Sequence, residues 1–301
     1  MLYGNGRMDE TARRAATADL YALPGHLLWR AAARVSRRID RALPGSVDVH
    51  SYATLVALAD QEPQSQAGLA QLTGVSRTTL SSVASTLLTE DLVERVRNPE
   101  DRRSYSLTRT PAGRSAVRRW GPPLARLEKQ LTAPLSPADA ERLRGLLHRV
   151  AAEDLDERTP HQLLASTGFL LTKAHQHTHR EFAASLAPLA IEPRDFGTLR
   201  ALRSVGPMTQ GELAALLDVS PATVVHLVDH LGKRGLVSRE RDEADRRAYR
   251  LHLSPAAERV VEAGSARSAT LLQDRIGGPG SADREDLVRL LKHLLEDGGP
   301  A

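Results

Sequence analysis

Apolar side chains recur every three or four residues between His26 and Leu43, with polar residues between them. This spacing predicts an amphipathic helix that buries one face. A second stripe begins after Ser136-Pro137, a pair typical of a helix start. The two stripes, which we expect to pack in a helical core, consist of Leu28, Ala32, Val35, Ile39 and Leu43, and of Leu143, Leu146, Leu147 and Val150.

Between these stripes, the pattern predicts two short helices separated by a tight turn. Ser65 and Ser76 each precede a helical pattern, and serine side chains cap helix N-termini. Thr73-Gly74 interrupts the periodicity between them. The second helix has one apolar face, so its opposite face is left free. That apolar face consists of Leu80, Val83, Ala84 and Leu87.

Residues of alternating polarity follow this helix-turn-helix. The segments "LVERVR" and "SYSLT" predict two short strands. The polar turn between them carries Asp101, Arg102 and Arg103. The expected product is a two-stranded hairpin, or wing, with arginines at its tip.

The same order of elements recurs in the second half of the chain. When the sequence is shifted by about 144 positions, residues 48–112 match without a gap at about 24 of 65 positions. The wing triplet then falls on Asp245, Arg246 and Arg247, and Thr209 with Glu212 forms a capping-box pattern. We interpret this as a tandem duplication with domains 1–153 and 154–301. Thr159-Pro160, just after the acidic boundary segment, suits a helix cap and first position.

The free face of the second helix in each copy is a candidate surface for reading DNA. Short side chains approach base edges in the major groove without obstruction, and guanidinium groups suit the negative potential of the minor groove. Any surface helix has a polar face, so the helix alone does not decide the function. The arginine-tipped wing beside it, present twice, favours DNA binding. The candidate helix residues are Arg77, Thr78, Ser81, Ser82 and Ser85 in copy one, and Val225 and His226 in copy two.

The composition excludes cysteine-based chemistry and argues against a membrane-spanning protein. The 301 residues have a net charge of +4 and no cysteine, which excludes disulfides, thiolate metal sites and cysteine catalysis. The basic residues are nearly all arginine, which suits phosphates, although a GC-rich genome enriches arginine as well. No apolar run approaches the roughly 20 residues needed to cross a bilayer, and no signal peptide is evident. We expect a cytoplasmic protein without a membrane partner.

These motifs resemble the MarR family of winged helix-turn-helix transcription regulators. The family wing pattern is Asp-x-Arg, an apolar strand position, then Leu-Thr-x-x-Gly. Copy one departs from it at Arg109, where a leucine is expected, and copy two has Ser254 and Ala257 in place of Thr and Gly. The resemblance implies that Arg103 and Arg247 enter the minor groove, with Arg102 and Arg246 near phosphates.

The resemblance also implies a fold and partners. We expect a mainly α protein with small β wings, in which two winged helix-turn-helix domains and a helical dimerisation-like region form an intramolecular pseudo-dimer on a double-stranded DNA operator. A homodimer with four wings is the alternative assembly. Repression is expected by resemblance only, and one copy serving as a scaffold is a further alternative.

Members of the family commonly bind a small aromatic or anionic effector between the helical region and the winged lobes. The candidate residues for such a site are His26, Trp29, His50, Tyr52 and Phe196, each of which also suits ordinary packing. His175 and His179 have the spacing of a metal pair on a helix but no definite third ligand, so no metal is expected.

An enzyme is the least favoured class. The sequence has no phosphate-cradling glycine loop, no Gly-x-Ser-x-Gly elbow and no metalloprotease helix. We expect no catalytic activity and no cofactor. A winged-helix module that docks a protein partner, with one or both DNA-binding copies inactive, is the alternative to a DNA-binding regulator.

Overall fold

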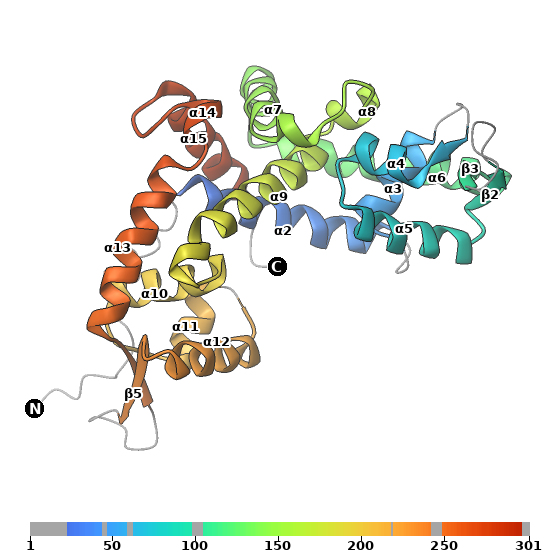
Figure 1. Ribbon diagram of the computed structural model, residues 1–301. Coiled ribbons are helices and arrows are strands. Elements are labelled where there is room, and N and C mark those ends of the chain that lie inside the picture. The colour runs from blue at the N-terminus through green and yellow to red at the C-terminus, as the bar shows by residue number, and fades with distance from the viewer. Residues whose placement is uncertain are drawn as a thin grey trace, which may run out of the picture. The chain divides into compact units, whose positions relative to one another are not determined.

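The computed structural model describes residues 23–43, 47–58, 63–97, 105–217, 219–241 and 249–296. These residues form mostly helices, with two small antiparallel sheets, as predicted (Figure 1). They divide into two compact units. We call residues 27–177 and 281–296 the first winged unit, and residues 23–26 and 178–280 the second winged unit.

The first winged unit contains the winged helix-turn-helix of copy one. Its helices are α2 (Pro24–Ala42, from Leu27 onward), α3 (Val49–Ala57), α4 (Gln66–Thr73), α5 (Arg77–Thr89), α6 (Pro111–Thr132), α7 (Pro137–Ala151), η1 (Ala152–Asp154), α8 (His161–Leu164), α9 (Thr167–Leu186, as far as His177) and α15 (Ala282–Glu296). Its strands are β1 (Gln64–Ser65), β2 (Val93–Arg97) and β3 (Tyr105–Arg109).

Local sequence signals account for the helix-turn-helix of copy one. Ser65 Oγ accepts a hydrogen bond from Gly68 N at 3.0 Å, and Ser76 Oγ accepts one from Thr79 N at 3.0 Å, so both predicted helix starts are confirmed. Gly74 ends α4 with φ 60°, a left-handed conformation that favours glycine. The turn to α5 therefore forms where the periodicity breaks.

The wing of copy one has three strands and not two. β3 pairs with β2 over the predicted hairpin, from Val93 opposite Arg109 to Arg97 opposite Tyr105. It also pairs on its other side with β1, giving the order β1-β3-β2. The prediction of a two-stranded hairpin missed β1, because two residues are too short to show alternation.

The second winged unit repeats this order of elements. Its helices are the rest of α9, η2 (Ala187–Leu189), α10 (Pro193–Val205), α11 (Gln210–Leu217), α12 (Pro221–Lys233), α13 (Pro255–Thr270) and α14 (Gln273–Ile276). Its strands β4 (Met208–Thr209), β5 (Val237–Arg241) and β6 (Tyr249–Leu253) have the order β4-β6-β5. The repeated order confirms the tandem duplication, and the predicted Thr209/Glu212 capping box is present.

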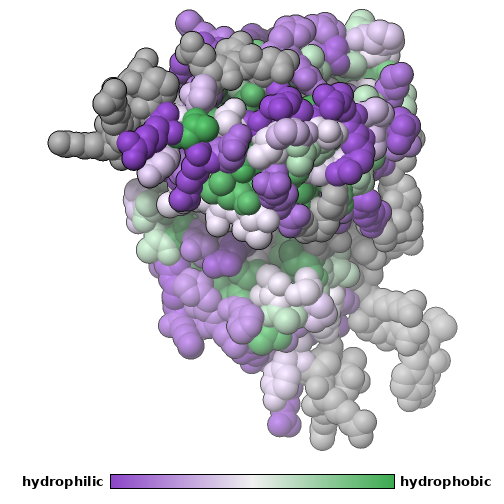
Figure 2. All heavy atoms as spheres, turned by 90° about the vertical axis from the view of Figure 1, so that its right-hand side faces the viewer, coloured by the Kyte–Doolittle hydropathy of each residue, from purple (hydrophilic) through white to green (hydrophobic). Residues whose placement is uncertain are grey.

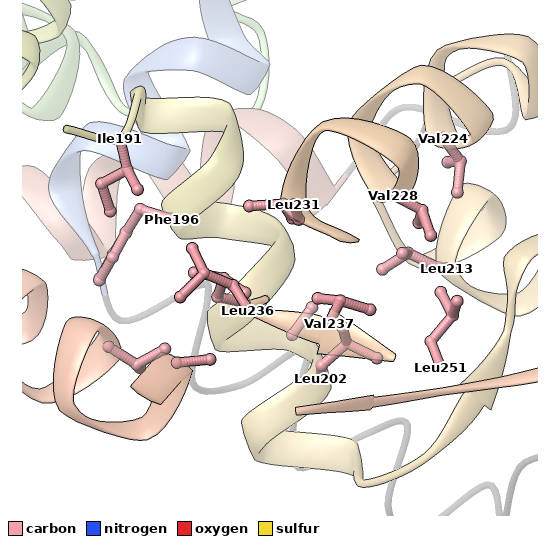
Figure 3. Packing of buried hydrophobic residues seen from close by; sticks show 14 of the residues in the cluster. Ile191, Phe196, Leu202, Leu213, Val224, Val228, Leu231, Leu236, Val237 and Leu251 are labelled. Carbon is pink, nitrogen blue, oxygen red and sulfur yellow. The ribbon is translucent and has the colours of Figure 1, made fainter. Parts of the chain in front are cut away.

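An apolar cluster lies at the centre of the helix-turn-helix and wing of the second winged unit. Figure 3 shows Val224 and Val228 of α12 on the side that faces Leu213 of α11, and Leu231 directed toward α10. Side chains from α10 complete the cluster, with Phe196 2% exposed. Burial of each such side chain stabilises the fold by about 1.5–3 kcal/mol relative to exposure. The apolar face of α12, which the repeat register equates with that of α5, is thus buried, and its opposite face stays at the surface.

The last helix of copy two packs in the first winged unit, against α7 of copy one. The predicted leucines of α7 are buried, and their counterparts on α15, Leu287, Leu290 and Leu291, are 0% exposed. Arg142 of α7 pairs with Asp283 and Asp286 of α15. These contacts form the expected dimerisation-like region within one chain. The compact units therefore cut across the repeats, and the boundary between 153 and 154 stays a prediction about the sequence.

No single helix among the described residues combines the length and apolarity needed to cross a bilayer. Within those residues, α11 and α12 reach that length and apolarity only together, and the pair is bent by 112°.

Candidate nucleic-acid interface

The reading face of copy one lies on α5. All five predicted residues, Arg77, Thr78, Ser81, Ser82 and Ser85, are exposed, whereas the apolar face of the same helix is buried. The 13 residues of α5 span about 20 Å, and the major groove of B-form DNA, about 12 Å wide, admits a helix. The structure therefore brings the five candidates together on one accessible surface.

Hydrogen bonds at α5 engage the hydroxyl of Thr78 and the backbone carbonyls of Ser82 and Ser85. The hydroxyls of Ser76 and Thr78 lie 2.8 Å apart at the helix start. The backbone carbonyls of Ser82 and Ser85 accept hydrogen bonds from Thr86 and Thr89. Arg77 differs, because no described residue forms a hydrogen bond or ion pair with its guanidinium group. Its five N–H donors are therefore available to bases or phosphates.

The reading face of copy two has different chemistry. Val225 is 40% exposed and His226 is also exposed on α12. Asp229, on the same side of the helix, forms an ion pair with Arg239 of β5. This pairing compensates a negative charge that would otherwise repel phosphates. Copy two therefore presents an apolar and imidazole surface where copy one presents hydroxyls and a guanidinium.

The four wing-tip arginines, Arg102, Arg103, Arg246 and Arg247, lie outside the described residues. The strands that carry the tips are described, and each ends in an exposed arginine paired across the ladder with an exposed tyrosine. These pairs are Arg97 with Tyr105, which is 59% exposed, and Arg241 with Tyr249, which is 47% exposed.

Sequence reasoning did not select these four residues as site candidates. The available signal was their identity in both repeats, at the strand ends next to each wing tip. Exposed tyrosine hydroxyls and arginine side chains are common phosphate contacts in protein–DNA complexes. Figure 2 shows the side of the first winged unit near α5 and β2, where hydrophilic residues predominate and hydrophobic ones form small groups.

A cavity of about 230 Å³ lies in the first winged unit, among α2, α3, α6 and the segment 162–169. Its wall is mainly apolar, including Val35, Leu131 and Phe169. Arg38 and Tyr52 add polar groups, and the Tyr52 hydroxyl lies 3.2 Å from Gln162 Nε2. The Nη1 atom of Arg38 is buried, and none of the described residues accepts a hydrogen bond from it. An unpartnered guanidinium nitrogen beside an apolar cavity suits a ligand that carries an acceptor.

The corresponding region of copy two is filled by aromatic rings. By the repeat register, Phe182 and Phe196 stand where copy one has Arg38 and Tyr52. Their rings meet edge to face, with centroids 5.3 Å apart. Gly264 stands where copy one has Trp120, and a Cβ atom there would lie only 2.6 Å from the Phe196 ring. Phe196 therefore occupies the space that a side chain at position 264 would need.

The structure does not gather the five predicted effector residues in one place. Tyr52 is the one that lines the cavity, while Phe196 belongs to the core of the second winged unit. His26 and Trp29 are half-buried on α2. His50 is half-buried on α3, and its burial, with the nearby charge of Lys173, lowers its pKa against the opposing effect of Asp48. Burial raises the pKa of Tyr52, so its hydroxyl is protonated at neutral pH.

The histidine segment of α9 contains a pair that the sequence did not single out. His175 is half-buried and His179 is exposed. Between them in sequence, His177 is 1% exposed, and its Nδ1 atom lies 2.9 Å from Asp154 Oδ2.

Arg109, the departure from the wing pattern, is 7% exposed, and its backbone carbonyl accepts a hydrogen bond from Arg114.

Comparison with known proteins gives the family. Models of the MarR family match residues 46–104 and 191–249, one segment in each copy. This chain is a tandem MarR-family protein. Both matches cover the helix-turn-helix and the start of the wing, the segments that the repeat register superposes.

Two curated relatives of this MarR-family chain are described as transcription regulators. A proposed regulatory protein for the hcr operon of Thauera aromatica is 34% identical over 103 residues, which are 34% of this chain and 62% of the relative. The uncharacterized HTH-type transcriptional regulator YsmB of Bacillus subtilis (strain 168) is 38% identical over 85 residues, 28% of this chain and 58% of the relative. The chain thus spans about three fifths of each relative's length.

Solved MarR-type structures match one repeat-length of the chain. BpsR of Bordetella bronchiseptica, whose DNA binding is regulated by 6-hydroxynicotinic acid, is 27% identical, with a TM-score of 0.40, over 44% of this chain and 94% of its own. The repressor CouR bound to a 23-mer DNA duplex is also 27% identical, with a TM-score of 0.40, over 42% and 91%. CouR from Rhodococcus jostii RHA1 has also been solved with p-coumaroyl-CoA.

Proposed function

We propose that this protein is a sequence-specific, double-stranded-DNA-binding transcription regulator. The observation that carries the proposal is the pair of exposed reading faces, α5 and α12, each followed by an arginine-bearing wing. Membership of the MarR family and the descriptions of the relatives support it. In this proposal α5 and α12 enter the major groove and the wing tips enter the minor groove. The inferred location is the cytoplasm, where a chromosomal operator is accessible.

One chain supplies both halves of the DNA-binding assembly. The α7–α15 contact joins helices of the two repeats with buried leucines and ion pairs. The two reading faces differ in chemistry, so the proposed operator has unlike half-sites and is not a perfect palindrome. A homodimer with four wings is distinguished by sedimentation at nanomolar concentration.

The proposed effector is a small aromatic carboxylate that binds in the first winged unit. The cavity of about 230 Å³ is larger than an apolar cavity of roughly 150 Å³ that holds benzene. Arg38 supplies a donor for the carboxylate, and Tyr52 supplies a ring edge and a hydroxyl. 6-Hydroxynicotinic acid, which regulates DNA binding by BpsR, is a molecule of this class. Its binding would shift the protein toward a form that releases the operator, which makes the regulator a repressor.

Selection of DNA fragments from the source genome tests the proposal. Fragments retained by the full chain are sequenced, and a duplex of the enriched sequence is titrated at several salt concentrations. We expect an affinity that falls steeply with salt, since phosphate contacts release counterions. Arg77→Ala should weaken binding, whereas Arg259→Ala, which removes an exposed arginine from α13, should change it little. If no sequence is enriched and the affinity for DNA does not change with salt concentration, the proposal of a DNA-binding regulator fails in favour of a module that docks a protein partner.

A further inference from the structure

The segment that opens the second repeat packs against the helix-turn-helix of the first repeat. Two of its side chains donate hydrogen bonds to the turn between α4 and α5, within the first winged unit. Thr159 Oγ1 donates to the carbonyl of Leu72, and Lys173 Nζ donates to the carbonyl of Gly74, each at 3.0 Å. The last carbonyls of a helix have no intrahelical partner, so these bonds satisfy acceptors that the turn leaves open. Thr159 is therefore not a helix cap; α8 begins after Pro160 without a side-chain cap.

The backbone of the same segment touches the turn directly. A Cβ atom at Gly74 would lie 2.3 Å from the carbonyl oxygen of Asp154. Gly74 also has a left-handed conformation. Glycine is therefore required at this position both for the turn and for the approach of residue 154. The start of α5 is held by contacts from the second repeat as well as by its own cap.

Lys173 makes this contact with almost no access to water. Its side chain is 1% exposed, and its ammonium also donates to Gln176 Oε1 at 3.2 Å. The ammonium lies 5.4 Å from the centroid of the Phe169 ring, within the range of a cation–π interaction. A buried ammonium persists only where partners replace its hydration. By the repeat register, copy one has Trp29 where copy two has Lys173, so the two repeats differ at this position.

Phe169 has a second role, because it also lines the cavity. Gln162, Leu163 and Ser166, from the same short segment, line it as well. The same stretch of chain thus forms one wall of the cavity and, through Lys173, donates the hydrogen bond to the carbonyl of Gly74. We call this hydrogen bond the tie to the reading helix α5. A ligand that moves Phe169 changes the surroundings of the Lys173 ammonium without touching α5.

We propose that Lys173 is a positioning residue that couples the cavity to α5 through Phe169 on one side and the carbonyl of Gly74 on the other. The coupling acts on copy one's reading helix and leaves α12 of copy two unaffected. Its effect on DNA rests on the proposed function, but the tie itself is a property of the free protein. A shift of Phe169 favours a state in which the α4–α5 turn opens.

Hydrogen exchange of the full chain, without DNA or ligand, tests the tie directly. Lys173→Met should speed exchange of the amides in the α4–α5 turn by roughly tenfold, the cost of losing a charge-assisted hydrogen bond. Lys173→Arg, which keeps a cation and donors, should restore part of the protection. The α11–α12 turn is the internal control and should not change. If Lys173→Met unfolds the chain, Thr159→Val removes the neighbouring bond with little change of shape and should speed exchange at the same turn. Unchanged exchange there in a folded variant overturns the proposal.

A second pair of variants tests the link to the cavity. Phe169→Leu removes the ring beside the ammonium, and we expect it to loosen the α4–α5 turn. Leu131→Ala is the matched control, because Leu131 is a buried residue of α6 on the cavity wall. If the two variants speed amide exchange in the turn equally, the cause is a general loosening of the core, and the proposed coupling through Phe169 and Lys173 is overturned.

The pH dependence of exchange supplies a signature that packing alone does not give. Burial lowers the pKa of Lys173 to about 8, with a smaller opposing effect of Asp154. An open turn hydrates the amine and returns its pKa toward 10.5, so opening takes up a proton. Protection of the turn, corrected for intrinsic exchange, should therefore rise between pH 8 and 9, by at most about tenfold per pH unit.

The charged and titratable neighbours of this amine are His50 on α3 and Asp154, which itself contacts His177. His50 has a lowered pKa and is neutral above pH 7. The pH response should vanish in Lys173→Met; a response that persists there overturns the assignment to Lys173. With the selected duplex, Lys173→Met should also weaken binding. If the wild-type chain selects no DNA but the exchange results hold, the regulator proposal fails and the tie stands.

Discussion

The two repeats share a fold but differ in what their interiors hold. In copy one, Arg38 and Tyr52 line a cavity; in copy two, Phe182 and Phe196 occupy the equivalent positions and pack edge to face. A homodimer has two equivalent interiors, whereas a fused pair is free to specialise. We therefore propose that copy one binds the effector, whereas copy two, with aromatic rings at the equivalent positions, does not.

The largest expected difference between the repeats concerns stability. Phe196→Ala should lower the free energy of unfolding by about 3–5 kcal/mol, because it removes a buried ring from a filled core. Tyr52→Ala should cost about 1 kcal/mol, because Tyr52 is half-buried and already borders empty space. Urea denaturation followed by circular dichroism measures both changes. Equal losses for the two variants would remove the distinction between a filled and an open interior.

The second-largest expected difference concerns how much each reading face contributes to the affinity for DNA. Arg77→Ala should weaken binding to the selected duplex by about tenfold or more, since one guanidinium contact to a base or phosphate is lost. His226→Ala, on the equivalent helix, should weaken it less, because an imidazole offers fewer N–H donors than a guanidinium. Fluorescence anisotropy at fixed salt gives the two affinities. A larger loss for His226→Ala would make copy two the dominant reader.

Ligand binding should depend on copy one alone. Arg38→Met should abolish binding of an aromatic carboxylate such as benzoate, because the Arg38 guanidinium, with its buried Nη1 atom, is its only proposed charged partner. Arg37→Met is the matched control, since Arg37 is an exposed neighbour on the same helix. Isothermal titration calorimetry should give one site per chain for the wild type and for Arg37→Met. Two sites per chain would contradict a closed interior in copy two.

Much of this architecture follows from local sequence patterns. Serine caps, a glycine C-cap and apolar stripes determine α4, α5 and their counterparts, and these signals act within a few residues. The repeat register places Leu287, Leu290 and Leu291 at the positions of the α7 leucines, and they are buried as well.

The contacts that distinguish the repeats were not predictable in the same way. Thr159 was expected to cap a helix, but its hydroxyl donates to Leu72, 87 positions earlier. The cavity depends on side chains from four separate segments, and no periodicity records which of them leave space. Lys173 lies on a helix with no sign in the sequence that its ammonium would be buried.

The smallest expected difference concerns acid stability. Burial lowers the pKa of His50 in the folded chain below its unfolded value near 6.5, so the unfolded chain takes up a proton first on acidification. The free energy of unfolding should therefore fall as pH drops from about 7 to 5, by less than about 1.4 kcal/mol per pH unit from this group. Position 194, its counterpart in copy two, is an arginine, so copy two has no equivalent histidine. His50→Gln should flatten the pH dependence of urea denaturation, and an unchanged slope in that variant would assign the effect to another group.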